Sequence, residues 1–233
     1  MSGNVLNEFC DEFAALCMSD QPEEKKILLG QNSLEQLLQE HSVTGEMLEK
    51  VLSNNLVLSS RLFAIDPNDI TLYREPAGLF FVRILIWEAG KKYPVHDHGA
   101  WGVVGCLLND IQETKYDRLD DQSVPNYAVL QVRSQAVLKP GETSFVLATD
   151  AGIHNMEAVD KLAISIHAYS TPVRKGFIQC YLPEKNRVEK MFPLSKRKQI
   201  LAARALNSLS QVHANEGYKR ILDKLDDEIK REL

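Results

Sequence analysis

Between residues 79 and 182 the chain carries a succession of short strand-like segments with no helical pattern between them. Branched and aromatic residues dominate several of these segments, and turn residues such as Asn109-Asp110 and Pro140-Gly141 separate neighbours. Many short strands at near-regular spacing are typical of a closed barrel or a jelly roll, so we expect a mainly β fold. The predicted strands are 79–87, 102–108, 111–116, 127–132, 134–138, 144–147, 162–169 and 176–182.

Both ends of the chain have helical patterns instead. Leu6, Phe9, Phe13 and Leu16 recur on one face of a helix, and further helix starts are predicted at Asp20-Gln21-Pro22, Ser33 and Thr44. Segments 195–209 and 217–233 are also predicted to be helical, with a charged, solvated face on the last. We therefore expect one compact domain made of a helical flank (1–60), a barrel (61–185) and a helical extension (186–233).

The composition of the chain argues against nucleic acid and membrane as partners and indicates the cellular compartment. Hydrophobic residues make up 44% of the 233 residues, and the net charge of −5 does not suggest a nucleic-acid-binding protein. Charges interrupt the apolar stretches, so no membrane span is expected, and no export signal is visible near Met1. The four cysteines form no C-x-x-C pair, which predicts free thiols in a reducing compartment and a cytoplasmic protein. The sequence leaves the oligomeric state open.

The most informative chemistry lies at Pro94-Val95-His96-Asp97-His98-Gly99. Residues two apart on a strand point to the same face, so His96 and His98 would aim two imidazoles at one point. Neutral imidazole suits iron, nickel, copper and zinc. A metal needs a further ligand, and Gly152 lets the backbone turn sharply enough to present His154 inward. These three histidines are the predicted metal ligands.

A second constellation lies on one predicted strand, where Ser165, His167 and Tyr169 share a face. The opposite face is apolar. Burying three polar side chains costs a few kcal/mol unless they bond to one another or to water. The strand is therefore either an edge whose polar face meets solvent or the wall of a hydrated cavity that holds a hydrogen-bonded relay.

These motifs resemble those of the cupin family. Gly90-x(5)-His96-x-His98 is similar to its first motif and Pro140-x(13)-His154 to its second. The usual first motif has a glutamate four or five residues beyond the second histidine, where this chain has Gly102 and Val103. Three histidines without a carboxylate resemble the cysteine dioxygenase-like branch, and the segment from Pro94 to Gly105 is similar to bacterial thiol dioxygenases, including 3-mercaptopropionate enzymes. The resemblance covers residues 61–185, about half of the chain.

The resemblance implies a cupin double-stranded β-helix that binds Fe(II) through His96, His98 and His154. It also implies the oxidation of a small thiol, of the cysteine or 3-mercaptopropionate type, to its sulfinate with O2. Three neutral ligands would leave the metal its full charge, which favours a substrate that binds as a thiolate.

The family's Ser-His-Tyr triad corresponds to Ser165, His167 and Tyr169 by its spacing, which makes these the predicted catalytic residues. The family also carries a substrate-facing arginine or glutamine near the position of Arg74, so Arg74 is the predicted partner of the substrate carboxylate. Arg83, on the same strand face as Leu85 and Trp87, and Arg174 are alternatives.

In animal-type cysteine dioxygenases a cysteine five residues after the second histidine is crosslinked to the triad tyrosine. Val103 occupies that position and Cys106 lies three residues later, so we expect no thioether to Tyr169. Two other functions stay open: a cupin that uses another metal, such as a nickel or manganese dioxygenase or an isomerase, and a non-enzymatic cupin that binds a metal or small molecule. The missing glutamate disfavours a cupin that uses another metal. A non-enzymatic cupin would not explain why Ser165, His167 and Tyr169 share one face of a strand.

Overall fold

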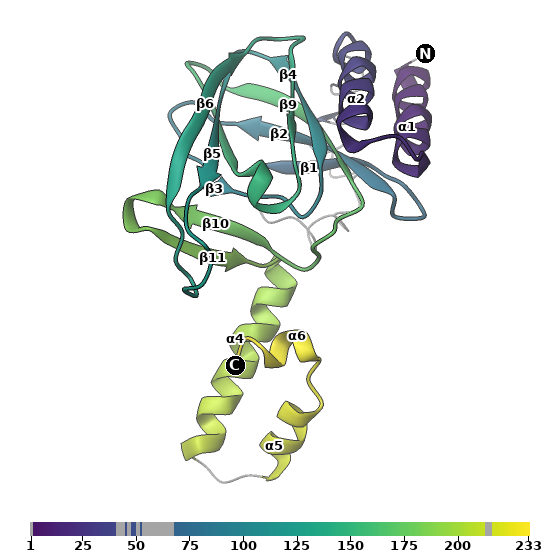
Figure 1. Cartoon of the computed structure of the whole chain (residues 1–233). Helices are drawn as coiled ribbons and strands as arrows, with labels where there is room; N and C mark the ends of the chain where they lie inside the picture. The colour runs from purple at the N-terminus through teal and green to yellow at the C-terminus, as the bar shows by residue number, and fades with distance from the viewer. Residues whose placement is uncertain (1, 41–44, 46–47, 50–51, 53–67, 213–215) are drawn as a thin grey trace.

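The computed structural model describes residues 2–40, 45, 48–49, 52, 68–212 and 216–233. Two antiparallel sheets face each other and form a mainly β barrel (Figure 1). The five-stranded sheet has the order β1-β2-β9-β4-β7, and the six-stranded sheet has the order β11-β10-β3-β8-β5-β6. From β2 to β5 and from β6 to β10, consecutive strands alternate between the sheets, as in the jelly roll that the sequence predicts.

The strands of the five-stranded sheet are β1 (Asp69–Arg74), β2 (Phe80–Trp87), β4 (Gly102–Leu108), β7 (Thr143–Val146) and β9 (Ala163–Ser170). Those of the six-stranded sheet are β3 (Val95–His96), β5 (Ile111–Arg118), β6 (Leu130–Leu138), β8 (His154–Ala158), β10 (Ile178–Leu182) and β11 (Arg187–Met191).

Four of these strands, β1, β3, β8 and β11, are not among the predicted ones, and β1 differs from a core strand in having no fully buried residue. β3 has only two residues, β8 is short and polar at its start, and β11 is rich in charged side chains. β11 lies in the segment assigned to the C-terminal helices and pairs along its whole length with β10, so the sheet extends to Met191. The two strands predicted over 127–132 and 134–138 are one continuous strand, β6, because both halves pair with β5.

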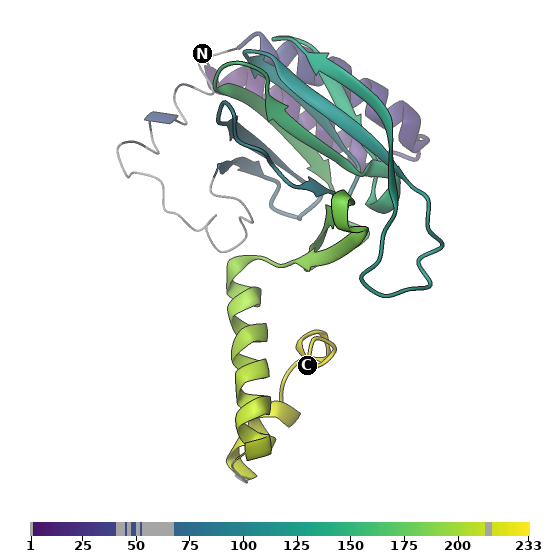
Figure 2. The same cartoon turned by 90° about the vertical axis from the view of Figure 1, so that its left-hand side faces the viewer.

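Two N-terminal helices, α1 (Ser2–Met18) and α2 (Glu23–Leu38), lie side by side on the outer face of the five-stranded sheet (Figures 1 and 2). Phe13 and Leu34 are fully buried there and pack in one core cluster with Ile166 and Ala168 of β9. The apolar face of β9 is therefore covered by helices, and its polar face looks into the barrel.

One predicted helix start is wrong. Ser33 lies inside α2 rather than at a helix end, and its hydroxyl donates to Glu12 of α1 at 2.5 Å. In sequence, a serine that caps a helix cannot be told apart from a serine that, like Ser33, bonds to a neighbouring helix. The helix predicted at Thr44 and the boundary placed at residues 60–61 lie outside the described residues.

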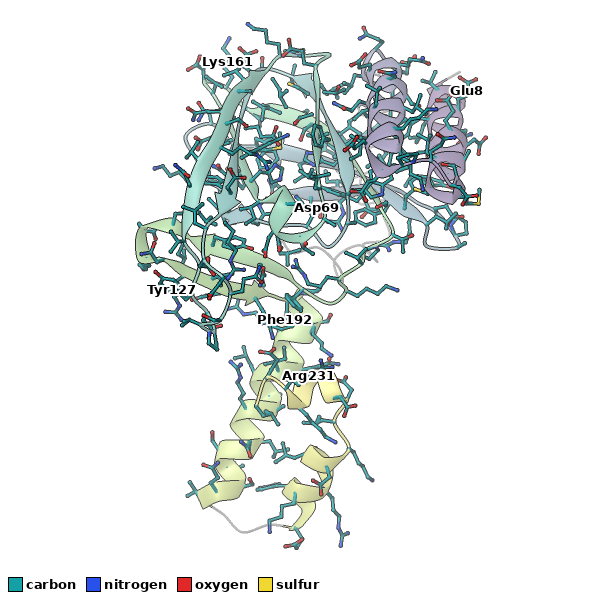
Figure 3. All side chains as sticks on the ribbon, viewed as in Figure 1. Glu8, Asp69, Tyr127, Lys161, Phe192 and Arg231 are labelled. Atoms are coloured by element: carbon teal, nitrogen blue, oxygen red, sulfur yellow. The ribbon has the colours of Figure 1, made fainter. Side chains whose placement is uncertain are left out.

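The C-terminal helices α4 (Leu194–Val212), α5 (Glu216–Asp223) and α6 (Asp227–Lys230) project away from the barrel (Figures 1 and 2). Ile200, Ala203 and Ile229 form a small core there, with Phe192 packed against it where the barrel meets α4 (Figure 3). Among the helices that the structure describes, none has the length and apolar character that a membrane crossing requires. All four cysteines are free thiols, as predicted.

Candidate metal centre and active site

The three predicted ligands meet at one point of the barrel. His96 ends β3, His98 follows two residues later, and His154 begins β8, where it is the register partner of His96. Their candidate ligand atoms all lie within 4.8 Å of one another, and the Nε2 atoms of His98 and His154 are 3.0 Å apart. Among the described residues, no carboxylate belongs to this cluster.

The hydrogen bonds of two imidazoles suit a bound metal. Nδ1 of His96 lies 3.0 Å from the Pro94 carbonyl, and Nδ1 of His154 lies 2.7 Å from a carboxylate oxygen of Glu113. Each Nδ1–H can therefore donate outward, which leaves the lone pair of Nε2 for the cluster. Burial, followed by the neighbouring histidines, lowers the pKa of His96 to about 3 and that of His98 well below its usual value. Neutral imidazoles are the form in which histidine binds metals.

Glu113, on β5, is a site residue that the sequence did not reveal. Its side chain is 3% exposed and also accepts a hydrogen bond from Ser144 at 2.5 Å, while Lys115 lies 3.6 Å away. Burial alone would raise the pKa of Glu113, but the contacts with His154, Lys115 and Ser144 lower it below its usual value. The carboxylate thus holds the His154 ring in one orientation and one tautomer.

We expect the change Glu113→Gln to weaken metal binding about 10- to 100-fold, because outer-shell carboxylates orient histidine ligands and raise their basicity. The measurement is the dissociation constant of the metal, with circular dichroism as a check on folding. Glu157→Gln on β8 is the matched control, because Glu157 contacts Gln112 and does not line the cavity. Equal metal affinity in the Glu113 variant and the wild type would contradict the assignment.

Ser165, His167 and Tyr169 form the hydrogen-bonded row that their spacing allows. Nε2 of His167 lies 2.7 Å from the Ser165 hydroxyl oxygen, and Nδ1 of the same ring lies 2.8 Å from the Tyr169 hydroxyl oxygen. All eight residues of β9 are buried, so the interpretation as a solvent-facing edge is wrong. The polar face of β9 instead forms part of the cavity wall, which His167 and Tyr169 line. The Tyr169 ring lies 4.7 Å from the His98 ring, between centroids, which joins the triad to the metal cluster.

Trp87 of β2 sets the direction of these hydrogen bonds. Its indole N–H donates to the Ser165 oxygen at 2.8 Å, and Ser165 is fully buried, so the serine O–H has only His167 to donate to among the described residues. Nδ1–H of His167 then donates to Tyr169, whose own O–H is left to point into the cavity. Burial lowers the pKa of His167 and raises that of Tyr169, so the relay is neutral at pH 7.

Replacing Trp87 with phenylalanine is expected to lower turnover about 5- to 10-fold, the usual worth of one lost hydrogen bond, with metal content unchanged. Loss of the N–H lets the relay reverse, and Tyr169 then donates back to His167. The kcat of the metal-loaded protein tests this, with Trp101→Phe as the comparison because Trp101 packs in the core cluster beneath α1. An unchanged kcat would show that Trp87 only fills space.

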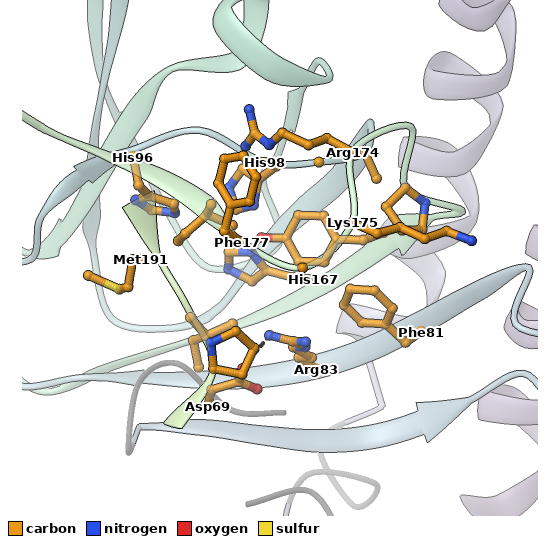
Figure 4. A pocket seen from close by; sticks show the side chains of 18 of the residues that line it. Asp69, Phe81, Arg83, His96, His98, His167, Arg174, Lys175, Phe177 and Met191 are labelled. Carbon is orange, nitrogen blue, oxygen red and sulfur yellow. Dashed lines mark hydrogen bonds and ion pairs between the residues drawn. The ribbon is translucent and has the colours of Figure 1, made fainter. Parts of the chain in front are cut away.

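His96, His98, His154, His167 and Tyr169 line one cavity of about 730 Å³, within the range of cavities that bind small molecules (Figure 4). Leu85, Met156 and Met191 supply apolar walls, and the first turns of α4 close the outer end through Lys196 and Gln199. The C-terminal extension therefore contributes to the cavity.

All three candidate arginines line the cavity, in different ways. Arg74 is exposed at the end of β1. Arg83 lies on β2 with its side chain 20% exposed. Arg174 follows β9 and directs both terminal nitrogens to Asp97, which is fully buried between the two first-motif histidines. The Asp97 carboxylate also accepts from the Gln179 backbone at 2.7 Å, so this ion pair fixes the loop that carries His96 and His98.

The surroundings of Tyr169 agree with the absence of a crosslink and correct one detail. The residue opposite Tyr169 on β4 is Gly102, whereas Val103 is opposite Ala168. A side chain on Gly102 would come within 2.6 Å of the Tyr169 ring, so the ring occupies the space that a side chain would fill. Cys106 is the register partner of Ser165, two pairs further from the tyrosine on the triad face.

A jelly-roll barrel with three convergent histidines defines a cupin with a candidate metal centre. The sequence model of cysteine dioxygenase type I matches residues 23–181, more than half of the chain. The chain therefore belongs to the cysteine dioxygenase type I family, as the motifs predict.

Three similar solved structures have low sequence identity to this chain. The Schizosaccharomyces pombe Cnp3 cupin domain is 12% identical, with a TM-score of 0.34 over 44% of this chain and 59% of that one. DMSP lyase DddQ from Ruegeria pomeroyi is 15% identical, with a TM-score of 0.34 over 52% of each chain. Hydroquinone 1,2-dioxygenase PnpCD is 10% identical, with a TM-score of 0.35 over 44% of this chain and 63% of that one. The matches span less than two thirds of each of these proteins.

Proposed function

We propose that this protein is an Fe(II)-dependent thiol dioxygenase that converts a small thiol of the cysteine or 3-mercaptopropionate type to its sulfinate. The observation that carries the proposal is the contact between two sites: a three-histidine cluster without a carboxylate, and a neutral Ser-His-Tyr relay that ends beside it at the His98 ring. Membership of the cysteine dioxygenase type I family supports the same chemistry.

The balance of the reaction is RSH + O2 → RSO2H, so the thiol supplies all the electrons and no second reductant is needed. His96, His98 and His154 would hold the iron. Bound there, Fe(II) would lower the pKa of a coordinating thiol and make O2 reactive toward sulfur. Three protein ligands would leave coordination positions of the metal for the substrate and for O2.

The chain's own residues would bind and orient the reactants. Tyr169 donates its O–H into the cavity toward the substrate carboxylate or the oxygen that reacts, and His167 and Ser165 hold it in that direction. Leu85, Met156 and Met191 would exclude bulk water from the reacting sulfur. The raised pKa of Tyr169 keeps it a hydrogen-bond donor across the physiological range.

The deciding experiment measures O2 consumption by Fe(II)-loaded protein with cysteine, 3-mercaptopropionate, cysteamine and a thiol-free control, together with mass detection of the sulfinate. We expect uptake with at least one thiol and an equal amount of sulfinate. The same assay with nickel- or manganese-loaded protein identifies the metal. No uptake with any thiol, from protein shown to hold iron at the three histidines, would refute the proposal and favour a binding role.

A further inference from the structure

The carboxylate that holds the His154 ring is itself part of a buried, charged cluster. Oε1 of Glu113 lies 2.7 Å from Nδ1 of His154, and its Oε2 accepts a hydrogen bond from Ser144 at 2.5 Å. Oε2 also lies 3.6 Å from Nζ of Lys115, in an ion pair whose lysine and glutamate side chains are 17% and 3% exposed. The three-histidine cluster thus has a carboxylate one contact away from it, and that carboxylate has a cation beside it.

The ammonium group of Lys115 is held in one place. Nζ donates to the Ser144 hydroxyl at 2.9 Å and to the Phe145 carbonyl at 2.8 Å, and it lies 4.3 Å from the centroid of the Phe145 ring. Two of its three N–H donors are therefore used by β7, and the third can be directed to Glu113. The cluster joins β5 of one sheet to β7 of the other, so both sheets fix the position of the charge.

Lys115 lies beside the metal centre but outside the main cavity. Neither Lys115 nor Glu113 lines that cavity, so a small molecule bound there would reach neither side chain. Lys115 shares a separate pocket of about 10 Å³ with His154, and it is the register partner of His154 between β5 and β8. An effect of Lys115 on the metal would therefore pass through its charge and through Glu113.

We infer that Lys115 is a positioning residue that cancels the charge of Glu113, so that the metal keeps the full positive charge that three neutral imidazoles leave it. Two opposite charges close together produce little net field at the metal, whereas an unopposed buried carboxylate would stabilise Fe(III) over Fe(II). The inference rests on the proposed function in one respect, because the positive charge that Lys115 preserves is what favours a substrate bound as a thiolate.

The test measures the reduction potential of the Fe(III)/Fe(II) couple in the protein at saturating iron and without thiol, with the EPR signal of Fe(III) as the readout. Lys115→Met removes the charge and keeps an unbranched side chain, whereas Lys115→Arg keeps the charge. Lys115→Gln, which can still donate to the Phe145 carbonyl, replaces the methionine variant if thermal unfolding shows that variant to be unstable. Lys139→Met, in an exposed ion pair with Asp110, is the matched control.

We expect the potential to fall in Lys115→Met and to rise in Glu113→Gln. In the double variant Glu113→Gln/Lys115→Met it should return close to the wild-type value, because the pair is again without net charge. Lys115→Arg and Lys139→Met should keep the wild-type potential. Binding of 3-mercaptopropionate without O2 should be about 10-fold weaker in Lys115→Met, because a less positive metal centre attracts a thiolate less strongly.

Two results would overturn the inference. An unchanged potential in Lys115→Met would show that its charge does not act on the metal. Shifts in the same direction in Glu113→Gln and Lys115→Met would show that the cluster only supports the fold. If no thiol supports O2 uptake, the proposed function fails, and the potentials, which are measured without thiol, still decide the role of Lys115.

Discussion

Replacing His154 with alanine is expected to abolish thiol-dependent O2 uptake and to lower metal affinity by more than the roughly 100-fold that an outer-shell change costs. The imidazole is 1% exposed and faces two other imidazoles, so no neighbouring described side chain replaces it as a ligand. The variant also removes the donor to Oε1 of Glu113 inside the barrel, and Ser144 then remains as the donor to Oε2. Metal content after reconstitution and O2 uptake are the two measurements.

The matched control for His154 is His167→Gln. Both histidines are buried, but only His154 belongs to the cluster. The control should retain the metal and lose turnover, because His167 acts through Tyr169. Full metal content in the His154 variant would show that the metal binds elsewhere. Metal loss in both variants would point to a general effect on folding, which thermal unfolding of the metal-free proteins would reveal.

Tyr169→Phe is expected to lower kcat about 100-fold while iron binding stays unchanged, the effect of removing one preorganised donor from a reaction centre. The ring would remain packed against Gly102 and Phe81, so the change removes the hydroxyl and little else. Metal content and kcat with the preferred thiol test this.

Tyr116→Phe provides the comparison for Tyr169. The Tyr116 hydroxyl bonds Asn155 at 3.2 Å and does not line the cavity, so its loss should leave kcat within about twofold. If Tyr169→Phe instead lost its iron, the tyrosine would be a structural support of the metal centre. If it kept full turnover, the relay would have no part in catalysis.

The predicted site residues are those that local rules can place. The histidines of His96-x-His98 and the three polar residues of β9 are each separated by two positions, and strand geometry alone puts such residues on one face. Gly152 and the second motif added His154. The mainly β fold followed in the same way from the length and spacing of the apolar segments.

The residues that the sequence did not reveal depend on pairing between distant strands. Glu113 reaches His154 because β5 pairs with β8, and Trp87 reaches Ser165 because β2 pairs with β9. Each looks ordinary in its own segment, one as a polar residue of a half-buried strand and the other as a core aromatic. Arg74 stays the predicted partner of the substrate carboxylate, and only strand register shows that Arg83 lies opposite His167.

The two halves of the site belong to different sheets. His96, His154 and Glu113 lie on strands of the six-stranded sheet, whereas Ser165, His167, Tyr169 and Arg83 lie on strands of the five-stranded sheet. The distance from metal to relay is therefore set by how the core side chains between the sheets pack, and not by any one strand. A substitution such as Met156→Leu, which changes the cavity wall but no ligand or relay residue, is expected to alter catalysis while metal affinity stays constant. Substrate preference and metal capture are thus free to evolve separately in this barrel.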